Sequence, residues 1–118
     1  MKTTFIAFDF ETTGFSPKAA EIIEIGAVKF DAQGKVLGTF EQLIKPSLGI
    51  NPDAQAVNGI SEAMVANCPS ITEVMPQFML FIGTPEQNVL IAHNAAHFDI
   101  GFLAMACARS GLPMPDHR

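Results

Sequence analysis

An α/β fold built on a mixed β-sheet is predicted by three features of this 118-residue sequence. Three strand-like apolar runs open the chain, and two helical segments follow them. A fourth apolar run then leads directly into a last helical segment. Because a helical crossover returns the next strand parallel to an earlier one, we expect the fourth strand beside the first, in the order 3-2-1-4.

The first three strands are expected at Thr3–Phe10, Glu21–Asp31 and Lys35–Lys45, where Ile, Val and Phe are frequent. The Gln33-Gly34 pair separates the second run from the third and is a turn signal. These three strands should therefore form an antiparallel meander. A loop with one short helical turn is expected over Pro46–Asn58.

Two helices are expected between the meander and the fourth strand, at Ser61–Ala66 and Ile71–Ile82. Ser70 is a good N-cap for the second helix, and Glu73 three residues later completes the pattern of a capping box. Pro76 falls near the first turns of this helix, where we expect it to be tolerated or to bend the axis.

The fourth strand is expected at Asn88–His93 and the last helix at Phe98–Arg109, which Gly111 and Pro113 close. This helix has almost no polar face, so more than one of its sides should be covered. We therefore expect self-association of the chain through the uncovered helix and through the unpaired edge of the fourth strand.

The composition fits one small folded domain, with 48% hydrophobic and 16% charged residues. A net charge of −5 argues against broad, charge-driven binding of nucleic acid, which needs a basic face. Cys68 and Cys107 have no zinc or redox spacing and are expected to be core thiols, as in a reducing cytoplasm. No apolar run has the features of a signal peptide or reaches membrane-spanning length, so a cytoplasmic location is expected.

The strongest functional signal is the pair of acids Asp9 and Glu11 at the end of the first strand, before a loop expected over Glu11–Ala20. Side chains alternate along a strand, so these two carboxylates must point to the same face. Two like charges beside an apolar core repel each other unless a cation lies between them. Hard oxygen ligands suit Mg²⁺ or Mn²⁺, so the pair predicts a metal-dependent active site.

Asp99 is the third candidate acid, in the first turn of the last helix, where the helix dipole stabilises a carboxylate. If the strand before this helix is parallel to the first strand, Asp99 should lie near Asp9 and Glu11. Three such acids can hold two divalent ions roughly 4 Å apart, an arrangement that cleaves phosphodiesters.

The sequence resembles a known enzyme family in four motifs that occur in the family's order and spacing. They are Phe8-Asp-Phe-Glu-Thr-Thr-Gly14, Glu21-Ile-Ile-Glu-Ile-Gly-Ala-Val28, Asn58-Gly-Ile-Ser61, and His93-Asn-Ala95 followed by Phe98-Asp-Ile-Gly-Phe-Leu103. The family is that of the DnaQ-like DEDDh 3′–5′ exonucleases, which includes the epsilon proofreading subunit of bacterial DNA polymerase III. The resemblance implies an RNase H-like fold, with helices on both faces of a five-stranded sheet whose fifth strand is missing from this chain.

The resemblance also implies roles for individual residues. Asp9, Glu11 and Asp99 match the metal-binding catalytic acids, with two Mg²⁺ or Mn²⁺ ions as cofactors. The family's substrate-binding positions correspond here to Thr12, Thr13, Gly14, Asn58 and Phe98. The first three match a segment that packs on the terminal nucleotide, Phe98 matches an aromatic beside the scissile end, and Asn58 stands where relatives usually carry His.

One family motif is absent, a His five residues before a fourth metal-binding Asp, because no His in residues 1–118 has Asp at that spacing. The family's general base is this His. We therefore expect residues 1–118 to be a single exonuclease domain that lacks its C-terminal third and is inactive or weak alone. His93 and His97 are better explained as ordinary strand-end and loop residues than as substitutes for the base.

Alternatives remain open at this point. The alternative for Asp9 and Glu11 is a solvated strand end, and for Asp99 it is a plain helix-terminal carboxylate, but the surrounding motifs favour the catalytic interpretation. The favoured function is proofreading-type hydrolysis at the 3′ end of single-stranded DNA, releasing nucleoside 5′-monophosphates, with a DNA polymerase subunit as a further partner. The alternatives are a truncated, non-catalytic module that binds nucleic acid or a polymerase, and an RNA-directed exonuclease of the same family.

Overall fold

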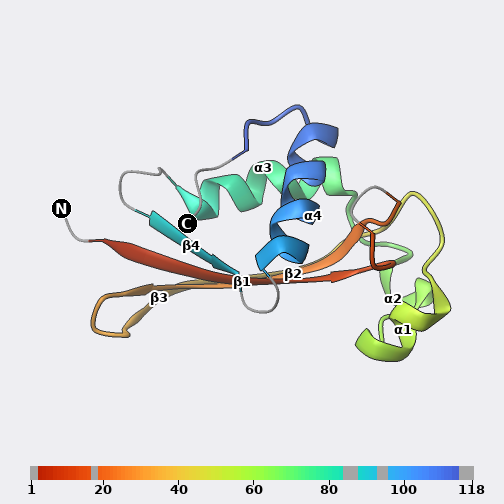
Figure 1. The fold of residues 1–118 in the computed structure, drawn as a ribbon, viewed down its shortest axis with the longest axis horizontal. Coiled ribbons are helices and arrows are strands. Elements are labelled where there is room, and N and C mark those ends of the chain that lie inside the picture. Colours follow the sequence, from red (N-terminus) through yellow and green to blue (C-terminus); the bar gives the residue numbers. More distant parts are fainter. Residues whose placement is uncertain (1–2, 17–18, 84–87, 93–95, 115–118) are drawn as a thin grey trace.

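The computed structural model describes residues 3–16, 19–83, 88–92 and 96–114, and at positions 88, 92 and 96–99 it describes the course of the backbone alone. Along this part of the chain, three strands are followed by three helices, then by a fourth strand and a fourth helix (Figure 1). The strands are β1 (Thr4–Thr12), β2 (Ile22–Asp31), β3 (Val36–Leu43) and β4 (Asn88–Ala92). The helices are α1 (Pro52–Asn58), α2 (Glu62–Val65), α3 (Ile71–Ile82) and α4 (Ala96–Arg109).

The four strands form one mixed sheet in the order β3-β2-β1-β4, as the sequence predicts. β2 pairs antiparallel with both β1 and β3, and β4 pairs parallel with β1. β1 is therefore bordered by a strand on each side, which fixes its course through the molecule. Its last parallel partner pair joins Phe8 to Ala92, so the chain leaves β4 beside the position of Asp9.

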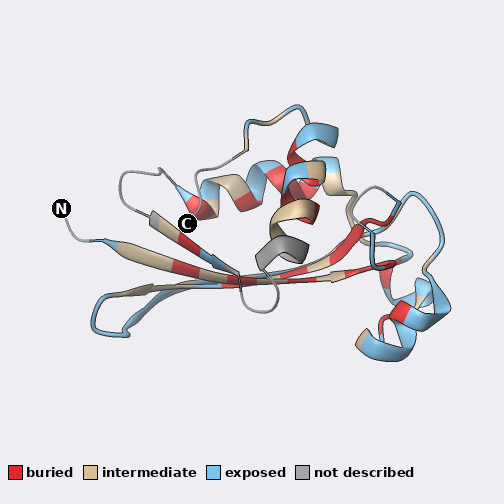
Figure 2. Ribbon diagram, viewed as in Figure 1, coloured by how far each residue is buried: buried red, intermediate tan, exposed pale blue. Residues whose placement is uncertain are grey.

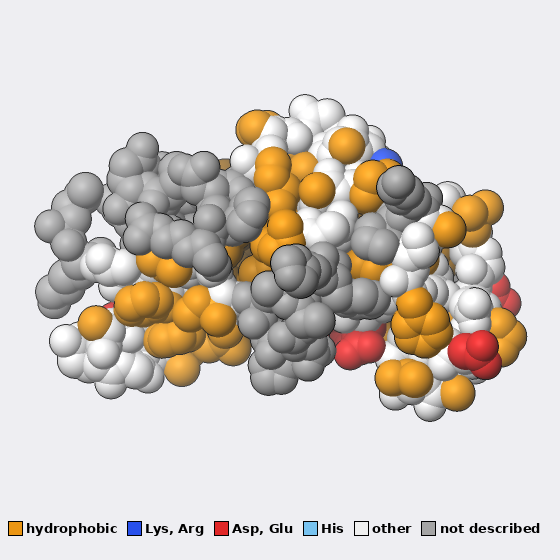
Figure 3. Space-filling view, in the orientation of Figure 1, with side chains coloured by type: hydrophobic (Ala, Val, Ile, Leu, Met, Phe, Trp, Pro, Cys, Tyr) orange, Lys and Arg blue, Asp and Glu red, His pale blue; other side chains and the backbone are white. Residues whose placement is uncertain are grey.

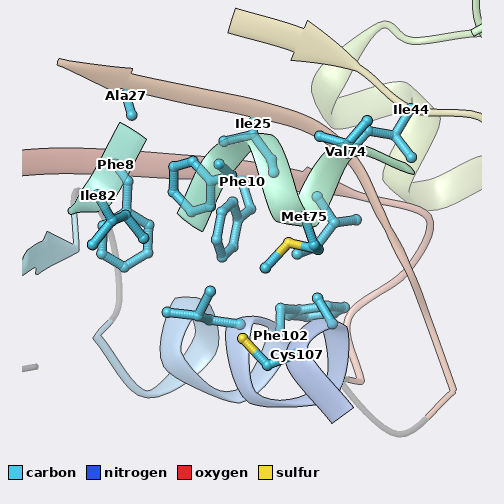
Figure 4. Packing of buried hydrophobic residues seen from close by; sticks show 14 of the residues in the cluster. Phe8, Phe10, Ile25, Ala27, Ile44, Val74, Met75, Ile82, Phe102 and Cys107 are labelled. Carbon is cyan, nitrogen blue, oxygen red and sulfur yellow. The ribbon is translucent and has the colours of Figure 1, made fainter. Parts of the chain in front are cut away.

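The main core lies between one face of the sheet and the helices α3 and α4 (Figure 1). Alternate residues of β1 are buried on this face, and the buried colour runs along the strand and the facing sides of both helices (Figure 2). Phe102 and Cys107 point from α4 toward Phe10 of β1 and Met75 of α3 (Figure 4). Burial of large side chains such as Phe10, Met75 and Phe102 is the main source of stability, at about 1.5–3 kcal/mol each.

A second, smaller cluster lies at the end of the sheet where α1 and α2 are attached. Ile23 of β2, Ile60 and Val65 are buried together there, with Leu43 of β3 packed against them. Leu43 pairs with Glu24, so this cluster lies on the face opposite α3 and α4. Helices therefore lie on both faces of the sheet, which confirms the predicted RNase H-like α/β architecture.

Several expected boundaries are corrected by the structure. β1 continues to Thr12, so Glu11 is a strand residue and not the start of a loop, because the pairing with β2 extends to Thr12 and Ile22. α4 begins at Ala96, two residues before the expected start, and β4 is described to Ala92. His93 lies outside the described residues.

The capping box predicted at Ser70 and Glu73 is wrong. The Ser70 hydroxyl makes no capping bond to the backbone of α3. It contacts the side chains of Thr72 and Glu73 instead, at 3.0 and 3.3 Å. Two neighbouring side chains therefore compete successfully with the backbone for this hydroxyl. Pro76 is tolerated inside α3, which spans Ile71–Ile82.

α4 differs from the helix expected from its composition. Among the residues of α4 whose side chains are described, the exposed ones are Ala104, Ala108 and Arg109, so residues 100–109 expose only small or charged side chains. Large exposed apolar residues lie elsewhere, including Val36 and Leu37 on the β2–β3 hairpin, where hydrophobic side chains gather in Figure 3. Self-association remains a prediction, although residues 100–109 of α4 expose no large apolar side chain. Within the described residues, no helix is both long and apolar enough to cross a membrane.

Candidate active site

Asp9 and Glu11 lie where the sequence predicts, on one face of β1 near its C-terminal end. Both are half-buried, whereas Phe8, Phe10 and Thr12 between and beside them are buried on the other face. The cross-strand partner of Asp9 is Gly26. The two carboxylates are thus carried by a strand whose opposite face is anchored in the core.

A β-bulge lies beside these acids. Glu11 pairs with Glu24, but the next residue, Thr12, pairs with Ile22, so Ile23 is an extra residue in β2. Bulges bend a strand and redirect side chains, and they are frequent next to active sites. Here the bulge turns Ile23 into the cluster under α2 while Ile22 enters the main core.

Two further carboxylates share the face of Asp9. Glu24 lies opposite Glu11, and Glu41 lies opposite Gly26, because β3 pairs with β2 in that register. Burial raises the pKa of Glu24 above its ordinary value of 4.5, and the neighbouring charges of Glu41 and Asp9 raise it further. This face therefore has an excess of negative charge that a bound cation would relieve.

A hollow of about 300 Å³ lies among these groups and is lined by Asp9, Gly26, Val28, Thr39 and Glu41, with their neighbours on β1 and β2. Gly26 contributes to it by having no side chain; a Cβ there would lie 4.0 Å from the backbone oxygen of Asp9. Sequence reasoning did not find Glu41, which has no motif of its own. Only the register of β2 and β3 reveals that it faces Gly26.

The segment Thr12–Gly14, predicted to bind substrate, is held by hydrogen bonds within the protein. The buried Thr12 hydroxyl donates to the carbonyl oxygen of Gly14 at 2.6 Å. The Thr13 hydroxyl accepts from the Glu21 amide at 2.9 Å, and the Thr13 amide donates to the Glu21 carbonyl at 2.8 Å. Gly14 approaches Ala20 so closely that a Cβ on it would lie 3.2 Å from the Ala20 Cβ.

Asn58 ties the end of α1 to the end of β1. Its amide nitrogen donates to the carbonyl oxygen of Thr12 at 3.1 Å, and its amide oxygen accepts from the Ile60 backbone at 3.0 Å. These bonds give Asn58 a structural role beside the acids. A contact between Asn58 and substrate stays a prediction.

Asp99 and Phe98 belong to the first turn of α4, which begins at Ala96. Their side chains lie outside what the structure describes, so the meeting of Asp99 with Asp9 and Glu11 also stays a prediction. Among the described residues, no group of three or more His, Cys, Asp or Glu side chains is arranged to hold a metal ion. The backbone course agrees with the prediction, because β4 ends beside β1 and α4 follows shortly afterwards.

The class of protein is given by comparison with known families. The model of the family described as "RNase_T: Exonuclease" matches residues 6–118. The chain therefore belongs to this exonuclease family, which confirms the resemblance to DnaQ-like exonucleases.

Particular relatives are DNA polymerase III proteins. The DNA polymerase III PolC-type of Thermotoga maritima is 44% identical over 102 residues, which are 86% of this chain and 7% of the relative. The DNA polymerase III subunit epsilon of Treponema pallidum is 44% identical over 99 residues, which are 84% of this chain and 44% of the relative. The chain thus spans less than half the length of these curated relatives.

Solved structures of exonuclease I share the fold. A crystal structure of SSB/exonuclease I with an inhibitor has a TM-score of 0.88 at 18% identity and covers 100% of this chain and 28% of that chain. Exonuclease I of E. coli in complex with a 5cy-dA13 oligonucleotide has a TM-score of 0.85 at 20% identity, over 94% of this chain and 25% of that chain. This similarity shows that the sheet and its helices have the same arrangement in these proteins.

Proposed function

We propose that this chain is part of a metal-dependent 3′–5′ exonuclease domain that hydrolyses the terminal phosphodiester of single-stranded DNA. The observation that carries the proposal is the position of Asp9 and Glu11. They share one face of β1, at the end beside which β4 leads into α4. Family membership supports the nuclease activity. The proposal that the substrate is DNA rests on the polymerase relatives.

The carboxylates suit divalent metal ions. Asp9 lies on a face with Glu24 and Glu41; burial raises the pKa of Glu24, and the charges of Glu41 and Asp9 raise it further. Oxygen-only donors of this kind favour Mg²⁺ or Mn²⁺ over softer-ligand metals. We infer that Asp9, Glu11 and Asp99 hold two such ions, which would supply an activated water and charge stabilisation at the scissile phosphate.

The chain's own residues would position the 3′ end. Thr12 and Thr13 use their hydroxyls within the protein. The segment Thr12–Gly14 would therefore offer the terminal nucleotide a fixed packing surface, with few new hydrogen bonds. With a net charge of −5, the protein would hold phosphate mainly through cations on its acidic face and not through a basic surface.

Two parts of the proposal concern groups outside residues 1–118. Since no His in this sequence has Asp five residues later, we propose that a His elsewhere in the same exonuclease domain acts as general base. The names of the relatives also lead us to propose association with a replicative DNA polymerase. Products would be nucleoside 5′-monophosphates.

The test is a 3′-exonuclease assay of the intact protein on 5′-labelled single-stranded DNA and RNA of the same sequence. With Mg²⁺ or Mn²⁺, we expect a ladder that shortens from the 3′ end, faster on DNA, and no cleavage with chelator. Release of 5′-monophosphates supports the mechanism. Cleavage from the 5′ end, or cleavage that persists in chelator, would contradict the proposal, and faster cleavage of RNA would reverse the substrate assignment.

A further inference from the structure

The side chain of Glu21 is a buried charge that the proposed chemistry does not use. Only 7% of the residue is exposed, although it carries a carboxylate and lies immediately before β2. A buried carboxylate is costly unless hydrogen-bond donors surround it. Its donors come from Ser47 and Leu48, more than 25 residues further along the chain.

The contacts of this carboxylate are numerous and specific. The Ser47 amide lies 3.1 Å from both carboxylate oxygens, and the Ser47 hydroxyl donates to Oε1 at 2.8 Å. The Leu48 amide donates to Oε2 at 3.0 Å. Hydrogen bonds to a charged group are stronger than neutral ones, so Glu21 holds this loop firmly.

The backbone of Glu21 is bonded at the same time to the predicted substrate segment. Its amide donates to the Thr13 hydroxyl at 2.9 Å, and its carbonyl accepts from the Thr13 amide at 2.8 Å. The Thr13 carbonyl in turn accepts from the Asn51 amide at 2.8 Å. These hydrogen bonds and the backbone of residues 48–51 form a closed ring of contacts, which we call the circuit. It runs from Thr13 through Glu21 to Ser47 and Leu48, along the loop to Asn51, and back to Thr13.

The circuit borders a hollow of about 450 Å³ whose walls include Thr13, Gly14, Leu48, Gly49 and Asn51. One wall is the predicted substrate segment and the other is the loop that Glu21 holds. We propose that Glu21 is a positioning residue, which fixes the distance between residues 12–14 and residues 47–51 and thereby sets the affinity for the 3′-terminal nucleotide. This inference rests on the proposed exonuclease function.

A carboxylate suits this task because it accepts from two backbone amides and one hydroxyl with a full negative charge. In Glu21→Gln the side chain keeps its shape but loses that charge, so its hydrogen bonds to the Ser47 and Leu48 amides become neutral and weaker. The loss of charge assistance is worth roughly a tenfold shift in an equilibrium. Misplacement of one wall by a fraction of an ångström should weaken substrate binding more than the chemical step.

The experiment compares Glu21→Gln with the wild-type protein and with Glu73→Gln, a matched control on an exposed carboxylate of α3. In Glu21→Gln we expect KM for a single-stranded DNA oligonucleotide to rise about tenfold while kcat changes less than about twofold. In Glu73→Gln both constants should stay within about twofold of wild type.

Hydrogen exchange supplies a readout that does not need activity. In Glu21→Gln, the amides of Ser47 and Leu48 should exchange faster because their acceptor loses its negative charge. If the circuit is real, the amides of Thr13 and Asn51 should also exchange about tenfold faster, although neither touches the changed group. Faster exchange confined to Ser47 and Leu48, or an unchanged KM, would overturn the inference.

A second variant covers the case in which Glu21→Gln does not fold. Ser47→Ala removes one donor to the carboxylate and leaves both backbone donors. It should raise KM and the exchange at Thr13 by about two- to threefold, and no change in either would overturn the inference. If the wild-type protein lacks 3′-exonuclease activity, the proposed function fails, and exchange at Thr13 and Asn51 still decides whether Glu21 positions the segment.

Discussion

Phe8 and Phe10 point from β1 into the core beneath α3 and α4, whereas Asp9 and Glu11 point from the same strand to the opposite, half-exposed face. On the core face, the rings of Phe8 and Phe10 are 5.1 Å apart, and Phe10 meets Phe78 of α3 edge-on at 6.2 Å. On the other face, like charges are gathered and the pKa of Glu24 is raised.

The contrast between these faces shows how one short strand serves stability and chemistry together. Aromatic packing on one side fixes the strand, and strand alternation then fixes the direction of the acids on the other. The acidic face costs free energy when no cation is bound, because its carboxylates repel each other and are partly desolvated. Burial of the core face offsets this cost, so the two faces should respond in opposite ways to substitution.

The largest effect is expected from a change to the core face. Phe78 is 0% exposed and contacts both Phe10 and Phe40, so Phe78→Ala should lower the free energy of unfolding by about 3–5 kcal/mol. Urea denaturation followed by circular dichroism measures it. Leu80→Ala on the same helix is the control, because Leu80 is 83% exposed and should change stability by less than about 0.5 kcal/mol. Equal losses in the two variants would contradict the assigned core.

A change to the acidic face should instead remove activity without loss of stability. Asp9→Asn should reduce metal-dependent exonuclease activity by more than about 100-fold, because a neutral amide is a poor ligand for Mg²⁺. The urea midpoint should stay close to that of the wild type, because Asp9 is half-buried on the face away from the core. Asp53→Asn, at an exposed carboxylate of α1, should keep activity within about twofold. Retained activity in Asp9→Asn would remove this residue from the site.

The fold could be predicted from sequence because its signals are local. Apolar runs, the Gln33-Gly34 turn and the helical crossover together predicted the order β3-β2-β1-β4. The errors lie where tertiary contacts decide. Pairing with β2 extends β1 beyond its apolar run to Thr12, and side-chain neighbours take the Ser70 hydroxyl away from the helix backbone.

The candidate site was predictable only in part, for a related reason. Asp9 and Glu11 lie two residues apart, so strand alternation alone places them on one face. Glu41 and the carboxylate contacts of Glu21 depend on register and on a loop more than 25 residues away, and neither leaves a pattern in the sequence. Asn58 was predicted from the family alone, and its bonds to Thr12 and Ile60 became visible only in the structure.

Asn58 offers a smaller test, because it braces the end of β1 from the side of α1. Asn58→Ala leaves the Thr12 carbonyl and the Ile60 amide without this partner, so we expect a loss of about 1–2 kcal/mol in the free energy of unfolding. Val57→Ala is the matched control, since Val57 lies on the same helix and is 77% exposed. If the two variants are equally stable, the hydrogen bonds of Asn58 contribute nothing to stability and β1 is held by its neighbouring strands alone.

The smallest effect, and the one that most directly separates the two faces, concerns Glu24. Burial and the charges of Glu41 and Asp9 raise its pKa in the folded protein above 4.5, so the folded state binds this proton more tightly than the unfolded state. Ionisation of Glu24 therefore lowers the free energy of unfolding as the pH rises from 4.5 through the raised pKa. Above that pKa this loss of stability stays constant. In chelator, Glu24→Gln should be more stable than wild type at pH 7, and the difference between the two proteins should shrink toward pH 4. Urea unfolding at both pH values measures this difference. A variant that is less stable at pH 7, or a difference that grows in acid, would show that Glu24 is stabilised in the folded state and that the carboxylates on this face do not repel one another.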